Sequence, residues 1–186
     1  GPATEMQCYR DIEAAFNHLR FEMEIPSHRI VLYGRSLGGG VSTFLAAHYG
    51  ETNQNIGGLI LHASFLSVYR ILIDSGCTLP GDQFVNIDIC AGIRAPTLVI
   101  HGKKDNVVPF SHAQDLQNAL NKECKTEPLF IESMGHNNVQ HQARPIFIRH
   151  VNKFLTDHVR YRKLKPTSQP QSDVYQKSAM ISTICN

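Results

Sequence analysis

The chain has 186 residues, of which 42% are hydrophobic and 18% are charged, so it can bury the core of one ordinary α/β domain. This composition excludes disordered, collagen-like and highly charged fibrous proteins. The formal net charge is only +2 with ten histidines counted as neutral. So small a charge gives no general attraction to nucleic acid or to anionic membranes, and we expect no nucleic-acid partner.

No apolar run in the sequence approaches the roughly 18 residues that a membrane-spanning helix needs. The five cysteines include no C-x-x-C pair, which argues against a disulfide framework or a zinc site. Reduced thiols are typical of the cytosol. The sequence therefore predicts a soluble, cytoplasmic protein without a metal or an organic cofactor.

The first predicted element is a helix near the start of the chain. Thr4 and Gln7 form a capping box, which is a signature of a helix N-terminus. Apolar residues then recur at spacings of three and four from Met6 to Met23, as on the buried stripe of an amphipathic helix. Pro26 follows this stripe and is expected to end the helix.

Strands and helices alternate through the rest of the domain. Short β-branched and apolar runs predict buried strands, and these lie at 30–33, 59–62, 96–102 and 128–132. A helix is expected after the first strand up to Gly50, another after a capping box of Ser111 and Gln114, and a last one near Pro145. This alternation predicts an α/β fold, a parallel sheet with helices on both faces.

Two segments depart from that alternation. Residues 63–95 have no clear periodicity and are too long for an ordinary connection, so we expect them to cap or line a site. After Arg160 the composition changes to Lys, Pro, Gln and Ser, so residues 1–160 are predicted to form the domain and 161–186 a poorly ordered polar tail. The basic segment 160–165 is interpreted as a solvated helix end in preference to a membrane or partner contact.

The junction between the first strand and its helix carries the motif Gly34-x-Ser36-x-Gly38. A serine at such a junction occupies a sharp, strained turn that lifts its hydroxyl clear of the sheet. Small residues on either side let strand and helix approach each other closely. Ser36 is therefore the candidate nucleophile, and the backbone N–H of Leu37 is the candidate oxyanion donor.

A serine hydroxyl needs a base, and the base needs an acid that orients it. In hydrolases with a nucleophile at this kind of turn, the acid and then the base follow the serine along the chain, each at the carboxyl end of a strand. Asp105 follows the third predicted strand and His136 the fourth, so both are in the expected order. Asp74 and Asp88 are rival acids, but neither directly follows a predicted strand.

Other patterns near these strands have weaker interpretations. His62 and His101 also end strands, and we interpret both as structural. The glycines between Gly34 and Gly40, together with Tyr161 and Lys165, resemble a short-chain dehydrogenase signature. The next strand, however, ends without the carboxylate that would bind a ribose hydroxyl, so a nucleotide cofactor is not expected.

Several stretches of the chain carry a family resemblance, and together they extend over about residues 1–155. They are residues 9–15, 31–38, 98–102, 110–112 and 135–137. They resemble the α/β-hydrolase superfamily and, within it, the alpha/beta hydrolase domain-containing protein 17 group of protein depalmitoylases. The resemblance implies a serine hydrolase with Ser36 as nucleophile, Asp105 as orienting acid and His136 as general base.

The expected reaction is hydrolysis of an acyl ester or thioester by two-step acyl transfer. The resemblance implies an acylated protein or a lipid-like ester as substrate, and depalmitoylation is the most specific reaction that it implies. The resemblance also implies that a cytoplasmic protein of this kind makes peripheral contact with the cytosolic face of membranes. A lipase, an esterase or a serine peptidase on the same fold remains an alternative, as does a catalytically impaired interaction protein. The sequence leaves the oligomeric state open.

The sequence departs from the family pattern at its start. The family fold has about four strands before the helix with which this chain begins, and one of their loops donates the second oxyanion-hole N–H. We therefore expect the chain to be the C-terminal part of an α/β-hydrolase fold. Loss of one oxyanion donor costs about 10²–10³ in rate, and the strand at 30–33 would have an unpaired edge. The isolated chain is expected to be unstable or nearly inactive.

Overall fold

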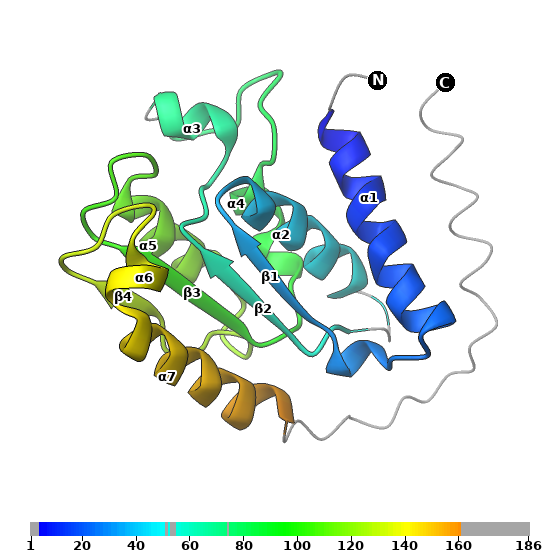
Figure 1. The fold of residues 1–186 in the computed structure, drawn as a ribbon. Coiled ribbons are helices and arrows are strands. Elements are labelled where there is room, and N and C mark those ends of the chain that lie inside the picture. Colours follow the sequence, from blue (N-terminus) through cyan, green and yellow to red (C-terminus); the bar gives the residue numbers. More distant parts are fainter. Residues whose placement is uncertain (1–3, 51, 53–54, 74, 161–186) are drawn as a thin grey trace.

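A four-stranded parallel sheet forms the centre of the structure, a computed structural model that describes residues 4–160 except 51, 53, 54 and 74 (Figure 1). The strands are β1 (Val31–Arg35), β2 (Gly58–His62), β3 (Thr97–Gly102) and β4 (Leu129–Ile131), arranged in that order across the sheet. All residues of β2 and β3 are buried, which explains why both read as continuous apolar runs. The predicted tail at 161–186 lies outside the described residues.

The helices follow the alternation that the sequence predicts, with short helical turns between the longer ones. The longer helices are α1 (Glu5–Asn17), α2 (Leu37–Gly50), α5 (Phe110–Ala119) and α7 (Arg144–Phe154). The shorter ones are α3 (Val68–Leu72), α4 (Asn86–Ile89) and α6 (Val139–Gln142). The π-helical turns are η1 (His18–Glu22) and η4 (Leu155–Arg160), and the 3₁₀ turns are η2 (Ser27–Arg29) and η3 (Cys90–Gly92).

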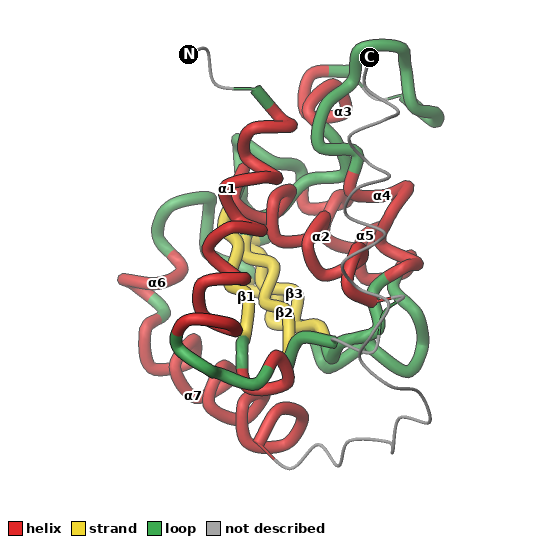
Figure 2. Tube along the Cα trace, turned by 90° about the vertical axis from the view of Figure 1, so that its right-hand side faces the viewer, coloured by secondary structure: helices red, strands yellow, loops and turns green. Residues whose placement is uncertain are grey.

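Helices cover both faces of the sheet, as predicted. Figure 2 shows the strands between α7 on one side and α2 and α5 on the other. On the side of α2 and α5, Leu45 and Leu116 pack in one core with Leu61 of the sheet. On the opposite side, Phe154 of α7 packs in a second core with Leu98 of β3. Burial of these apolar faces from water is the main force that holds the layers together.

The first helix begins where the sequence predicts, but its buried stripe is shorter than expected. The Gln7 N–H donates to Thr4 Oγ1 over 3.2 Å, which is the threonine half of the predicted capping box, and the Gln7 side chain donates to Asp11 Oδ1 over 2.7 Å. Met6 and Met23 at the two ends of the stripe are 48% and 55% exposed, whereas Phe16 is buried. The regular α-helix ends at Asn17 and continues as the π-helical turn η1, where Leu19 still packs against the core.

The predicted start of α5 at the Ser111–Gln114 capping box is wrong. The helix begins at Phe110, and Pro109 occupies the cap position without a side-chain hydrogen bond. The φ angle of Pro109 is −53°, and a proline ring holds φ near this value without further support. No helix among the described residues combines the length and the apolarity needed to cross a bilayer.

Candidate active site

Ser36 is the single residue between the end of β1 and the start of α2. Its φ angle is +49°, in the left-handed region, where a residue other than glycine carries about 1–3 kcal/mol of strain. Two backbone hydrogen bonds hold it there: its N–H donates to His62 O over 3.0 Å, and its carbonyl accepts from the Gly39 N–H over 2.9 Å. The serine therefore has the sharp turn that the motif predicts.

The glycines around Ser36 differ in what they contribute. A Cβ atom on Gly34 would lie 2.4 Å from the Gly38 carbonyl oxygen, so the strand and the helix could not approach as they do. A Cβ atom on Gly38 itself would meet nothing within 4 Å, whereas one on Gly39 would lie 2.2 Å from Ser64 Oγ. The close approach of strand and helix therefore requires Gly34, as the motif predicts. Gly39, which the motif does not single out, is needed where α2 passes Ser64 in the loop after β2, and Gly38 has open space.

Asp105 lies in the loop that follows β3, and its carboxylate is held from two sides. Oδ1 accepts hydrogen bonds from the backbone N–H groups of Val107 and Val108, each over 2.8 Å. Oδ2 lies 2.7 Å from Nδ1 of His136. The side chain of Asp105 is fully buried, and these hydrogen bonds hold its carboxylate in place, so it can fix the orientation of the imidazole.

His136 lies in the loop after β4, and the side chain of Arg35 connects this loop to β1. Arg35 Nη2 donates to the backbone carbonyl of His136 over 3.0 Å and also to Asn137 Oδ1. The structure thus joins His136 to Asp105 directly and brings the His136 loop to the residue that precedes Ser36. Within the described part of the chain, no hydrogen bond joins the Ser36 hydroxyl to the His136 ring. Such bonds are often long in uncomplexed enzymes and shorten when substrate binds.

The rival acids have other surroundings. Asp88 is exposed on α4, where Oδ2 accepts a hydrogen bond from Thr78 Oγ1 over 2.6 Å. Asp74 lies outside the described residues. Of the acids that the sequence offered and the structure describes, Asp105 is therefore the one bonded to His136.

The two histidines interpreted as structural are both buried beside the site. His62 Nδ1 lies 2.7 Å from the Tyr33 hydroxyl, and burial lowers the pKa of His62 to about 4. His101 Nε2 lies 3.0 Å from the Val108 carbonyl and 3.3 Å from Asp105 Oδ2, and burial lowers its pKa as well. Since a carbonyl only accepts hydrogen bonds, Nε2 of His101 carries the proton.

His101 Nε2 therefore donates its proton to the Val108 carbonyl, and the same nitrogen lies 3.3 Å from the carboxylate oxygen that also binds His136. This proximity to the candidate site was not expected from the sequence. The signal was the position of His101, which is the penultimate residue of β3 and four residues before Asp105. The spacing alone could not reveal the contact, because the loop after β3 has to turn back for Asp105 and Val108 to reach the ring.

Leu37 is the first residue of α2, so its N–H is among the helix donors that have no acceptor within the helix. The positive end of the helix macrodipole lies at the same place. A negative charge that develops on a carbonyl oxygen beside Ser36 would be stabilised there. The side chain of Leu37 is 49% exposed, so the site faces the surface of the described structure.

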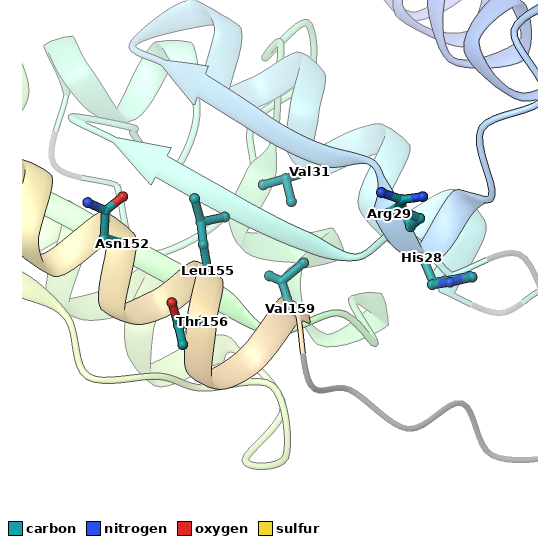
Figure 3. Close-up of a pocket in the computed structure, with 7 residues that line it drawn as sticks. All are labelled: His28, Arg29, Val31, Asn152, Leu155, Thr156 and Val159. Atoms are coloured by element: carbon teal, nitrogen blue, oxygen red, sulfur yellow. The ribbon is translucent and has the colours of Figure 1, made fainter.

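Phe65 and Leu66 belong to the segment 63–95 that the sequence predicts to cap or line a site, and they are 2% and 9% exposed and pack in the core. A cavity of about 690 Å³ lies at the amino end of β1, opposite the end that carries Ser36. Its lining residues come from η2, β1, α7 and η4 (Figure 3), and they are His28, Arg29, Val31, Asn152, Leu155, Thr156 and Val159.

No set of three or more His, Cys, Asp or Glu side chains within the described ranges is arranged to hold a metal ion. The chemistry that the arrangement offers is nucleophilic: an alcohol on a strained turn, an imidazole bonded to a buried carboxylate, and a free helix N–H beside the alcohol.

Sequence comparison identifies one matching family model and several similar proteins. A family model described as phospholipase/carboxylesterase matches residues 9–159. The chain is 38% identical over 143 residues to human alpha/beta hydrolase domain-containing protein 17B, an alignment that covers 75% of this chain and 46% of that protein. It is 35% identical over 159 residues to the protein of the same name from Xenopus tropicalis, with 84% and 51% covered. The chain spans about half the length of the curated relatives it matches.

Solved structures show the same fold in enzymes of different activity. The monoacylglycerol lipase of Paleococcus ferrophilus matches with a TM-score of 0.62 at 15% identity, over 85% of this chain and 77% of that one. The acylaminoacyl peptidase of Pyrococcus horikoshii matches with a TM-score of 0.66 at 14% identity, over 86% and 29% of the two chains. At such low identity these structures confirm the predicted fold and nothing finer. On the family match and the fold together, the chain belongs to the phospholipase/carboxylesterase family of α/β hydrolases.

Proposed function

We propose that this chain carries the catalytic centre of a serine hydrolase that cleaves acyl esters or thioesters. Ser36 is the nucleophile, His136 the general base and Asp105 the acid that orients the base. The observation that carries the proposal is the 2.7 Å contact between Asp105 Oδ2 and His136 Nδ1, because the carboxylate is fully buried and the contact lies beyond the carboxyl ends of the strands. Such a contact fixes the imidazole with Nε2 free to accept a proton.

The reaction then proceeds in two steps. His136 Nε2 takes the proton of the Ser36 hydroxyl while Oγ attacks the acyl carbon, and the Leu37 N–H donates to the oxygen that becomes negative. The intermediate collapses, the alcohol or thiol leaves with the proton from His136, and an acyl-serine remains. Water, deprotonated by His136, attacks this ester and releases the carboxylic acid and free Ser36.

Within this reaction class we propose a protein thioester, such as a palmitoylated cysteine, as the substrate. The similarity to proteins of the alpha/beta hydrolase 17 group supports this choice. We propose a cytosolic location with access to membrane surfaces, where acylated proteins lie.

A fluorophosphonate probe tests the reaction class, because it reacts with a serine only when a base activates it. We expect the full-length protein to be labelled on Ser36 and the Ser36→Ala variant to remain unlabelled with an unchanged unfolding temperature. A folded protein without labelling would refute the hydrolase proposal and favour a non-catalytic interaction protein. Matched thioester, oxygen ester and peptide substrates then separate a thioesterase from a lipase, an esterase or a peptidase.

A further inference from the structure

Arg35 makes two contacts that the reaction described above does not use. Its Nη2 atom donates to the backbone carbonyl of His136 over 3.0 Å and to the side-chain oxygen of Asn137. Arg35 is the last residue of β1, directly before Ser36. A single guanidinium therefore connects the strand that ends at the nucleophile to the loop that carries the base.

This connection joins the ends of two strands that are not neighbours in the sheet. Ser36 follows β1 and His136 follows β4, and two strands lie between them. Neighbouring strands are about 4.8 Å apart, so the backbone pairing of the sheet does not place the two side chains against each other. Something beyond the strand ladder has to set the distance between the alcohol and the imidazole.

Other contacts of the His136 loop fix it to the Asp105 side. The Lys104 N–H donates to the Met134 carbonyl over 2.9 Å. The same carbonyl lies so close to Gly102 that a Cβ atom there would be 2.2 Å away. These contacts fix the loop to the Asp105 side, and neither of them involves β1 or Ser36. The residues that do connect this segment to β1 are Arg35, through its contacts with the His136 loop, and Tyr33, whose hydroxyl accepts a hydrogen bond from Gln140 of α6.

The chemistry of the side chain suits this role. A guanidinium is planar and always charged, and its N–H donors have a fixed geometry, so two acceptors can hold it in one orientation. Both acceptors belong to consecutive residues of the His136 loop. A lysine could offer the charge and three N–H donors there, but these rotate about a flexible stem and lack the fixed planar geometry.

We propose that Arg35 is a positioning residue that holds His136 at reacting distance from Ser36. The inference rests on the proposed hydrolase function. Misplacement of a reacting group by about 1 Å costs about 10²-fold in rate. Loss of the guanidinium is therefore expected to lower the rate of the chemical step and to leave substrate binding nearly unchanged.

The test compares Arg35→Gln, Arg35→Lys and Asn137→Ala in the full-length protein, with Arg10→Gln as a matched surface control on α1. For each variant, the rate of fluorophosphonate labelling, kcat and KM on one acyl ester, and the unfolding temperature are measured. We expect Arg35→Gln to lower kcat and the labelling rate by about 10- to 100-fold with KM within about twofold. Arg35→Lys should recover part of the rate, Asn137→Ala should lose less than Arg35→Gln, and Arg10→Gln should behave as wild type.

The outcomes separate this inference from the proposed function. Wild-type protein that is folded and unlabelled at Ser36 would remove the proposed function, and the positioning role with it. Labelled wild type with Arg35→Gln at the wild-type rate per folded molecule would overturn the positioning role alone. If Arg35→Gln fails to fold, Arg35→Lys and Asn137→Ala decide: wild-type kcat in both would overturn the inference, and lowered kcat with unchanged KM supports it.

Discussion

Replacement of Asp105 by asparagine removes one charge and one acceptor at the centre of the site. The carboxylate accepts from the N–H groups of Val107 and Val108 through Oδ1, and Oδ2 faces both His136 Nδ1 and His101 Nε2. An asparagine can keep its carbonyl oxygen toward the two backbone donors. Its NH₂ group then replaces Oδ2 and donates to His136 Nδ1, so the imidazole carries its proton on Nε2. In that tautomer His136 cannot accept the proton of the Ser36 hydroxyl.

We therefore expect Asp105→Asn to lower kcat by about 10⁴-fold, the loss found when this tautomer is trapped in a serine hydrolase. That factor corresponds to about 5.5 kcal/mol of transition-state stabilisation. The assay is steady-state hydrolysis of an acyl ester together with the rate of fluorophosphonate labelling. Asp88→Asn, which changes the exposed acid on α4, is the matched control and should retain wild-type rates. Retention of more than about a tenth of the activity in Asp105→Asn would refute the assignment.

The other predictions concern stability. Gly39→Ala should lower the free energy of unfolding by about 1–3 kcal/mol through the clash of its Cβ with Ser64 Oγ. The control Gly38→Ala, which has open space, should not be destabilised, and equal losses in thermal denaturation would count against the packing argument. His62 has a pKa of about 4 in the folded protein against 6.5 for an unperturbed histidine. The unfolded chain therefore binds more protons, so stability is present above about pH 6.5 and falls as the pH decreases toward about 4. In chemical denaturation at several pH values, the free energy of unfolding of His62→Gln should decrease less with falling pH than that of the wild type. The same pH dependence in both proteins would contradict this prediction.

The sequence by itself determined the four strands, the presence of the longer helices and the order of the candidate site residues. Strands and helix starts can be predicted from apolar runs, from the Thr4 cap and from Pro145, because these signals depend on residues only a few positions away in the chain. The strained serine also follows from local pattern, since a short strand, a glycine-flanked serine and a helix succeed one another within a few residues. For the same reason Asp105 and His136 could be chosen by their positions after strands.

Only the tertiary structure decided which distant groups meet. The contact of Arg35 with His136 joins residues 101 apart in the chain, and the approach of His101 to Asp105 depends on how the loop after β3 turns. The burial of Phe65 and Leu66, and the need for Gly39 rather than Gly38, depend on the packing of α2 against its neighbours. A periodic pattern predicts whether a residue faces the core. It does not predict which side chain from a distant part of the chain packs against that residue.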